Sequence, residues 1–98
     1  MITSFGDQAT EDLFHGNASK ATRRFPSDIR RVARRKLDML NAAHELRDLR
    51  SPPGNRLEAL RGDLKGFHSI RVNDQWRVVF RWRGTDAEAV RITDYHKG

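Results

Sequence analysis

The stretch FHSIRVNDQWRVVFRW, residues 67–82, decides how this chain folds. Two runs rich in valine, isoleucine and aromatic residues flank a polar triplet at 73–75, a pattern that is typical of a β-hairpin. Side chains alternate between the two faces of a strand, so the length of the loop decides which residues share a face. A two-residue loop would pair Ile70 with Arg77 and would mix apolar with charged side chains.

A three-residue loop instead pairs Ile70 with Val78 and gives the hairpin one apolar face. The opposite face then carries Arg71, Arg77 and Arg81. We expect this register, although the third residue of such a loop usually has a left-handed backbone and is often glycine, whereas here it is Gln75. A hairpin with arginines along one side predicts a surface that binds phosphate.

The size of the chain limits its architecture and its compartment. With 98 residues it is expected to form a single small domain, residues 1–98, around one modest core. No window approaches the roughly 18 consecutive apolar residues of a membrane helix, and the N-terminus lacks a signal-peptide pattern. The absence of cysteine excludes disulfides and thiolate chemistry and fits a reducing compartment. We therefore expect a cytoplasmic protein that does not enter a membrane.

The charge of the chain is strongly basic. Nineteen lysine and arginine residues stand against thirteen acidic ones, which gives a net charge of +6 and a pI near 10.7. Most of the basic residues are arginine, whose planar guanidinium matches phosphate oxygens and stacks on bases. A basic surplus often serves solubility alone, but a pI above about 9 meets the first criterion for a nucleic-acid-binding domain.

The patterns along the chain predict an α+β fold. The predicted elements are an edge strand or strand start at 1–5, a helix at 7–15, a polar loop at 17–25, a second helix from an N-cap at Ser27 to about Glu45, a short strand at 56–60, the hairpin at 67–82 and a last strand at 88–94. We expect both helices to pack on one face of a mostly antiparallel sheet. The expected core consists of Ile29, Val32, Leu37, Leu40, Ile70, Val72, Val78, Phe80, Val90 and Ile92.

The second predicted helix has an outer face made of arginines. They are Arg30, Arg31, Arg34 and Arg35. Such a face is most often simply solvated. The alternative is a contact surface for RNA phosphates or for an acidic partner.

No metal or cofactor chemistry is indicated by the sequence. The four histidines show no spacing that brings three or four ligands together, and there is no cysteine. No serine lies in a GxSxG turn, and neither a P-loop nor a GxGxxG motif is present. We therefore expect a protein that needs no cofactor and no metal.

Metal-free RNA cleavage is a chemistry that the residues do support. It requires a base for the 2′-hydroxyl, cations for the charged phosphorane and an acid for the leaving 5′-oxygen. The residues of suitable type are Glu58, Arg61, Lys65, Arg71, Arg77, Tyr95 and His96. Each alone also has a simpler explanation as a surface or terminal residue.

Three motifs together resemble a known family. The segments LRGDLKG at 60–66, SIRVNDQWR at 69–77 and DYH at 94–96 are similar to those of the HigB branch of the RelE toxin superfamily. The N-terminal part, with a short acidic helix and then RRVARRKLDMLNAA, fits the same family. The resemblance covers essentially the whole chain and implies a RelE-like microbial RNase fold.

The resemblance also implies a function and roles for individual residues. Members are toxins of bacterial type II toxin–antitoxin pairs that cleave mRNA in the ribosomal A site without a metal. Carried over by position, Arg77 would hold the scissile phosphate and Gln75 would lie near it. Arg71, Arg61 and Lys65 would support RNA binding, and Asp94, Tyr95 and His96 would form the C-terminal catalytic motif, with His96 the best acid or base.

One departure from the family pattern affects the general base. Some HigB toxins have a histidine where this chain has Glu58, and a lysine where it has Arg61. A carboxylate can accept a proton but is a weaker base than imidazole at neutral pH. The resemblance therefore leaves the base open between Glu58 and His96.

The family also implies partners for the chain. These are a HigA-like helix-turn-helix antitoxin, the 70S ribosome with its mRNA, and operator DNA reached only through the antitoxin. The arginines at 30–35 would then contact ribosomal RNA. Two competing interpretations are a weakly active or inactive RelE-fold module, which acts by binding its antitoxin and as co-repressor, and a plain RNA-binding domain. The second of these leaves the DYH terminus unexplained.

Overall fold

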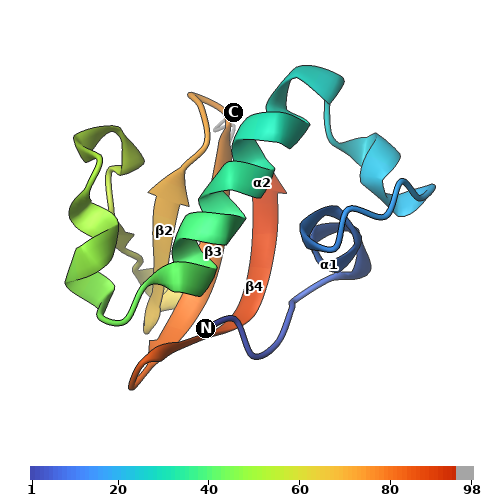
Figure 1. Ribbon diagram of the computed structural model, residues 1–98. Coiled ribbons are helices and arrows are strands. Elements are labelled where there is room, and N and C mark those ends of the chain that lie inside the picture. The colour runs from blue at the N-terminus through green and yellow to red at the C-terminus, as the bar shows by residue number, and fades with distance from the viewer. Residues whose placement is uncertain (95–98) are drawn as a thin grey trace.

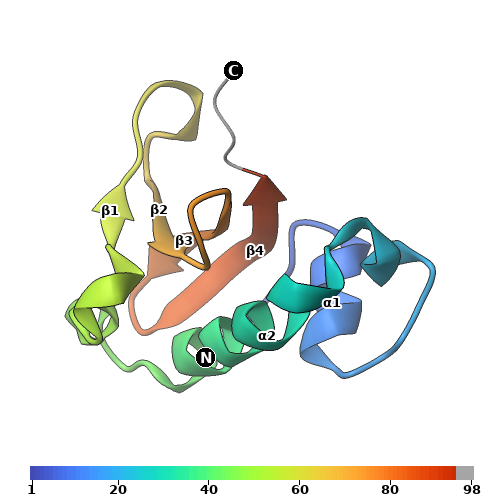
Figure 2. The ribbon, with the colours of Figure 1, turned by 90° about the horizontal axis from the view of Figure 1, so that it is seen from above.

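The computed structural model describes residues 1–94 and has two layers. One layer is a four-stranded antiparallel sheet in the order β1-β2-β3-β4. The strands are β1 (Glu58–Ala59), β2 (Phe67–Arg71), β3 (Trp76–Arg83) and β4 (Asp86–Asp94), and the α-helices are α1 (Gln8–Phe14) and α2 (Ser27–Ala42). Both helices lie on one side of the sheet (Figures 1 and 2), as predicted. No helix within residues 1–94 has the length and apolar character needed to cross a membrane.

The register of the β2–β3 hairpin follows the prediction from the sequence. Ile70 pairs with Val78, and Arg71 pairs with Arg77. The loop closes where the Val72 amide donates to the Trp76 carbonyl at 2.9 Å, which confirms the three-residue loop.

The loop needs no left-handed residue because a side chain closes it. The Asn73 carboxamide oxygen accepts from the main-chain amides of Gln75 at 2.9 Å and Trp76 at 2.7 Å. Such an Asx turn reverses the chain by itself.

The N-terminal segment adds a short parallel pairing to the far edge of the sheet. Isolated bridges join Ile2 with Ala87 and Phe5 with Val90, so the segment lies beside β4 as an edge but forms no regular strand. Opposite β3, the register of β4 shifts between the partners of Val79 and Arg81. Ala89 lies at this bulge with φ of 52°.

The helix ends differ in part from the prediction. Asp7 caps α1, because its carboxylate accepts from the Thr10 amide at 2.8 Å. Ser27 is the first helical residue of α2 rather than its N-cap, which is Pro26.

The second helix is shorter than predicted. α2 ends at Ala42, because Glu45 and Asp48 form a capping box for the 3₁₀ helix Leu46–Arg50 instead. Hydrogen bonds from the main-chain amides of Glu45 and His44 lower the pKa of Asp48.

The segment 17–25, predicted as a polar loop, contributes to the core. It contains the 3₁₀ helix Ala21–Arg24, and the Ser19 hydroxyl donates to Asp12 at 2.7 Å. Phe25 is fully buried, with its ring edge-on to Trp76 at a centroid distance of 5.7 Å. A hydrophobic residue at the end of a polar segment therefore anchors that segment to the sheet.

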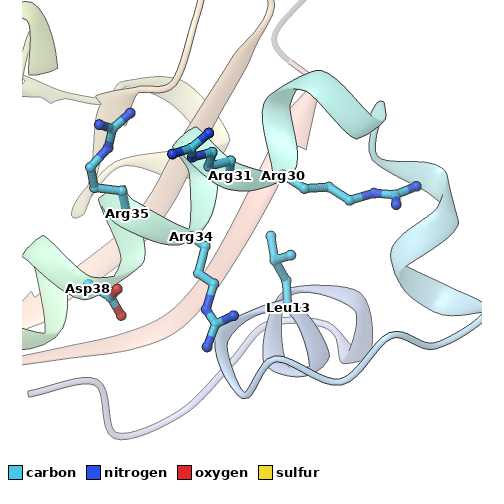
Figure 3. Close-up of a pocket in the computed structure, with 6 residues that line it drawn as sticks. All are labelled: Leu13, Arg30, Arg31, Arg34, Arg35 and Asp38. Carbon is cyan, nitrogen blue, oxygen red and sulfur yellow. The ribbon is translucent and has the colours of Figure 1, made fainter.

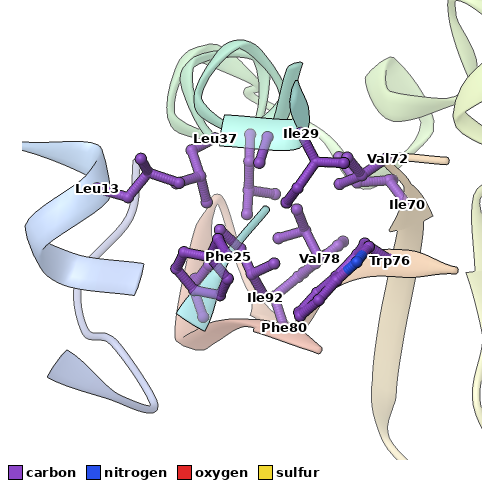
Figure 4. Packing of buried hydrophobic residues seen from close by; sticks show 14 of the residues in the cluster. Leu13, Phe25, Ile29, Leu37, Ile70, Val72, Trp76, Val78, Phe80 and Ile92 are labelled. Atoms are coloured by element: carbon purple, nitrogen blue, oxygen red, sulfur yellow. The ribbon is translucent and has the colours of Figure 1, made fainter. Parts of the chain in front are cut away.

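The core lies between α2 and the sheet (Figure 4). Nine of the ten predicted core residues are buried, and Val32 is only partly buried. The structure adds Phe25, Trp76 and Leu49, the last from the 3₁₀ helix after α2. Burying one such large side chain contributes roughly 1.5–3 kcal/mol to folding.

His68 lies at the margin of this core. Its ring stacks on Phe80 at a centroid distance of 6.1 Å. Burial lowers the pKa of His68 below its ordinary value of 6.5, and its Nδ1 atom has no hydrogen-bond partner among the described residues. The folded protein therefore favours neutral His68.

We predict that His68 makes the folded state acid-sensitive. Because its pKa is lower in the folded than in the unfolded chain, its contribution to stability is complete above about pH 6.5 and decreases as the pH falls below that value. Urea unfolding at pH 7.5 and pH 5.5 should show a smaller loss of stability for His68→Gln than for wild type. An equal loss in wild type and His68→Gln would refute this.

Candidate active site

The face of the sheet that carries no helix presents the predicted basic residues. Directly paired residues on neighbouring strands point to the same side. Arg71, Arg77 and Thr93 therefore form one row across β2, β3 and β4. Glu58, Ser69, Val79 and Arg91 form the next row, in which Ser69 and Val79 are fully buried. We call this surface the open face; it lies opposite the helices in Figure 2.

Arg77 is a largely enclosed arginine of the open face. Its side chain is 13% exposed, and its Nη1 atom forms an ion pair with Glu58 Oε1 at 3.5 Å. Its Nη2 atom donates to the main-chain carbonyl of Arg56 at 2.7 Å. The structure thus brings two predicted site residues, Glu58 and Arg77, into direct contact.

Arg71 lies directly opposite Arg77 across the hairpin. Its guanidinium pairs with the carboxylate of Asp74 in the hairpin loop. Asp74 is almost fully exposed, whereas the Arg71 side chain is 32% exposed. Two guanidinium groups at paired positions concentrate positive charge at the loop end of the hairpin.

The end of β4 reaches the same region of the hairpin. The side-chain amide of Gln75 donates to Asp94 Oδ2 at 3.1 Å. Asp94 pairs with Trp76 across the sheet. The structure therefore joins Gln75 to the first residue of the predicted C-terminal motif. Tyr95 and His96 lie outside the described residues.

Arg61 and Lys65 flank the 3₁₀ helix Gly62–Leu64 between β1 and β2. Both residues are exposed. This segment rises from the sheet on the side away from the helices (Figure 2). Their position is compatible with the predicted contact to RNA approaching the open face.

Arg81 lies further along the open face. Its guanidinium covers the ring of Phe67 at 4.9 Å from the ring centroid, and the two residues are strand partners. Phe67 is not among the predicted site residues, although its alternation with Ser69 and Arg71 in the sequence already placed an aromatic ring on the basic face.

The contact of the Arg56 main chain with Arg77 is a second feature that was not predicted from the sequence. Arg56 has a left-handed backbone with φ of 46° and ψ of 55°, and its carbonyl contacts Arg77. The Pro-Pro-Gly-Asn run before it indicated a turn. No sequence pattern indicated that the turn would end with a carbonyl directed at an arginine twenty-one residues later.

The predicted arginine face of α2 forms a separate surface on the helix side of the domain. A groove of about 530 Å³ between α1 and α2 is lined by Leu13, Arg30, Arg31, Arg34, Arg35 and Asp38 (Figure 3). Arg30 Nε donates to the Phe25 carbonyl at 2.9 Å, and Arg34 points towards α1 against Gly16. Arg31 and Arg35 are exposed.

Lys36 lies where α2 comes close to the open face. Its amine donates to the side-chain oxygen of the buried Asn55. Burial and the nearby charges of Arg35 and Arg71 lower the pKa of Lys36. The two basic surfaces therefore approach each other at this edge of the sheet.

The described residues contain no cluster that resembles a metal site. Within residues 1–94, no three histidine, aspartate or glutamate side chains are grouped so that they could hold a metal ion. On the open face, guanidinium groups of the kind that bind phosphate lie beside the carboxylates of Glu58 and Asp74.

Comparison with known proteins shows which proteins this chain is similar to. Over residues 3–96 the chain matches a family model described as the RelE-like toxin of type II toxin–antitoxin system HigB. It is 46% identical over 82 residues to Toxin HigB-1 of Vibrio cholerae, with 84% of each chain covered. It is 30% identical over 96 residues to Endoribonuclease HigB of Proteus vulgaris, with 98% of this chain and 100% of that one covered.

Solved structures share the architecture. YafQ from Escherichia coli matches with a TM-score of 0.63 at 13% identity, over 96% of this chain and 93% of that one. A YoeB/ParE toxin from Agrobacterium tumefaciens matches with a TM-score of 0.55 at 16% identity, over 97% of this chain and 100% of that one. At these identities the structural matches show the fold alone.

Proposed function

The chain belongs to the RelE-like HigB toxins of type II toxin–antitoxin systems, and from this premise we propose that it is an endoribonuclease that cleaves mRNA in the ribosomal A site. Cleavage there would inhibit translation and growth. The family relationship and the RelE-like fold, both expected from the sequence motifs, are confirmed. A type II toxin has an antitoxin as its partner.

The position of Arg77 supports this proposal most directly. A guanidinium that is 13% exposed and held by Glu58 and a carbonyl loses little rotamer freedom when it binds a phosphate. It lies on an open face that an extended RNA strand can reach. Preorganised positive charge at a developing phosphorane is commonly the largest single contribution that a protein makes to such a reaction.

The proposed reaction is an internal transesterification. The base accepts the proton of the 2′-hydroxyl, the 2′-oxygen forms a bond to phosphorus, and the bond from phosphorus to the 5′-oxygen breaks. The acid donates a proton to that 5′-oxygen. Arg77, with Arg71 beside it, offsets the negative charge of the phosphorane.

We assign proton transfer to Glu58 and the C-terminal motif. The Glu58 carboxylate is about half exposed and lies 3.5 Å from Arg77, within reach of a phosphate bound there. In this proposal Glu58 is the base and His96 the acid, with Asp94 and Tyr95 supporting His96. Arg61, Lys65 and Gln75 contact the RNA on either side of the reacting phosphate.

The arginines of α2 are proposed to bind the ribosome. Arg31 and Arg35 are exposed on the helix side, where contacts to ribosomal RNA phosphates would add affinity without reading sequence. Arg30 and Arg34 also hold neighbouring segments of the fold. Binding energy from this surface would position the open face in the A site.

The identity of the antitoxin is also part of the proposal. We propose a HigA-like helix-turn-helix protein, with operator DNA contacted only through it, and a cytoplasmic location where ribosomes are available.

A second candidate is a weakly active RelE-fold module that acts mainly through its antitoxin as a co-repressor. The observation that favours it is Glu58, a carboxylate whose charge already offsets part of that of Arg77.

We expect Arg77→Lys to lower the cleavage rate by on the order of 10²-fold, because an ammonium cannot reproduce the planar guanidinium contacts. The measurement is cleavage of mRNA on programmed ribosomes by purified protein, with circular dichroism to verify folding. Arg83→Lys, on the same strand but 70% exposed beside Glu88, is the matched control and should cleave as wild type. Equal rates for the two variants would contradict the assignment of Arg77.

We expect Glu58→Gln to lower the cleavage rate by about 10²-fold, because glutamine keeps the shape but cannot accept the proton. Ribosome binding should not change. If Glu58→Gln cleaves as wild type while His96→Gln is inactive, the base is His96. If wild type itself leaves ribosome-bound mRNA intact and does not arrest growth, the co-repressor candidate replaces the endoribonuclease.

We expect the double variant Arg31→Glu/Arg35→Glu to lose cosedimentation with 70S ribosomes at physiological salt, with the thermal midpoint near that of wild type. Arg47→Glu/Arg50→Glu makes the same change in net charge at exposed residues of the 3₁₀ helix Leu46–Arg50 and should still bind. Retained cosedimentation of the α2 variant, or equal loss in both, would remove α2 as the docking surface.

A further inference from the structure

We propose that Arg56 is a positioning residue whose main-chain carbonyl sets the orientation of the Arg77 guanidinium towards the substrate phosphate. The inference rests on the proposed function of Arg77 and extends it to a residue whose backbone, not its side chain, is used. Its basis is the hydrogen bond of 2.7 Å from Arg77 Nη2 to the Arg56 carbonyl oxygen.

The backbone of Arg56 has an unusual conformation at this contact. Its φ of 46° and ψ of 55° lie in the left-handed region, which a residue with a Cβ atom seldom adopts. The conformation follows the 3₁₀ helix Pro53–Asn55, and the Arg56 amide donates to the Pro53 carbonyl at 3.1 Å. Unfavourable backbone that persists in a fold marks a position that its surroundings constrain.

The constraint comes from Asn55, which is fully buried. Its side-chain amide donates to the carbonyls of Leu49 at 3.1 Å and Ser51 at 3.3 Å. Its side-chain oxygen accepts from Lys36 of α2. These hydrogen bonds hold the turn at Asn55 in place, so the carbonyl of Arg56 has a defined direction.

A carbonyl contact and a carboxylate contact affect a phosphate-binding guanidinium differently. Glu58 and the Arg56 carbonyl hold Nη1 and Nη2 of the same planar group, and two such contacts limit its rotation. The carboxylate also neutralises part of its charge. The carbonyl carries no net charge, so it orients Arg77 while the positive charge stays available for phosphate.

The experiment compares Arg56→Gly with Arg56→Pro. Both remove the exposed side chain, but glycine adopts φ near +46° readily and proline is restricted to about −65°. Cleavage of ribosome-bound mRNA is measured across ribosome concentrations, and the Arg77 Nε–Hε signal is followed in ¹H–¹⁵N spectra of the free protein.

We expect Arg56→Gly to cleave within about twofold of wild type, because it keeps the carbonyl in place. Arg56→Pro should lower the maximal rate about tenfold to a hundredfold, the scale expected for a misplaced reacting group. Its half-saturating ribosome concentration should stay within about twofold of wild type, and its Arg77 signal should shift. Arg56→Val, which disfavours the left-handed backbone without losing the amide, should change both readouts in the same direction, and remains informative if the proline variant does not fold.

Two results would overturn the proposal. One is a loss in Arg56→Gly as large as that in Arg56→Val, which would assign the role to the side chain. The other is a wild-type Arg77 signal and a wild-type rate in Arg56→Val and Arg56→Pro. Failure of the proposed function is a separate result: wild type would then leave ribosome-bound mRNA intact, or Arg77→Lys would cleave as wild type. The Arg77 signal in the Arg56 variants would still report whether the Arg56 carbonyl orients the guanidinium.

Discussion

The register of the β2–β3 hairpin is the constraint on which the rest of the structure depends. Pairing Ile70 with Val78 and Arg71 with Arg77 places the apolar residues against α2 and the arginines on the open face. A shift by one residue would exchange the two faces and put guanidinium groups into the core, where an unpaired charge is very costly. The core and the candidate site are therefore two consequences of one pairing.

The two basic surfaces lie on opposite layers of the domain, so the proposed ribosome-docking surface is separate from the proposed catalytic surface. The α2 arginines lie on the helix side (Figure 3), and Arg77 with Glu58 lies on the sheet side. Contacts remote from the reacting phosphate can supply binding energy that positions it. Asn55 and Lys36 connect the layers at one edge of the sheet, so in our proposal the packing of α2 contributes to the orientation of Arg77.

The Glu58 carboxylate has two opposite effects on the Arg77 guanidinium. In the proposed site, the Glu58 carboxylate in contact with Arg77 stabilises that side chain before RNA binds, but it would compete with the phosphate for the charge of the guanidinium. The neutral Arg56 carbonyl holds the same group without this competition. Among residues 1–94, the guanidinium of Arg77 thus has both a charged contact and an uncharged contact. In our proposal, their relative strengths affect how readily Arg77 turns to a substrate.

The amino-acid sequence by itself determined the α+β class, the hairpin register, the basic open face and nine of the ten core positions predicted from it. It did so because alternation and helical periodicity are local properties of the chain. It also carried the motifs of the HigB family. Only the tertiary structure decided that Phe25 enters the core, that α2 ends at Ala42 and that Glu58 and the Arg56 carbonyl meet Arg77. Those contacts join segments far apart in sequence, and their geometry depends on how a turn with one left-handed residue is packed, which no periodic pattern encodes.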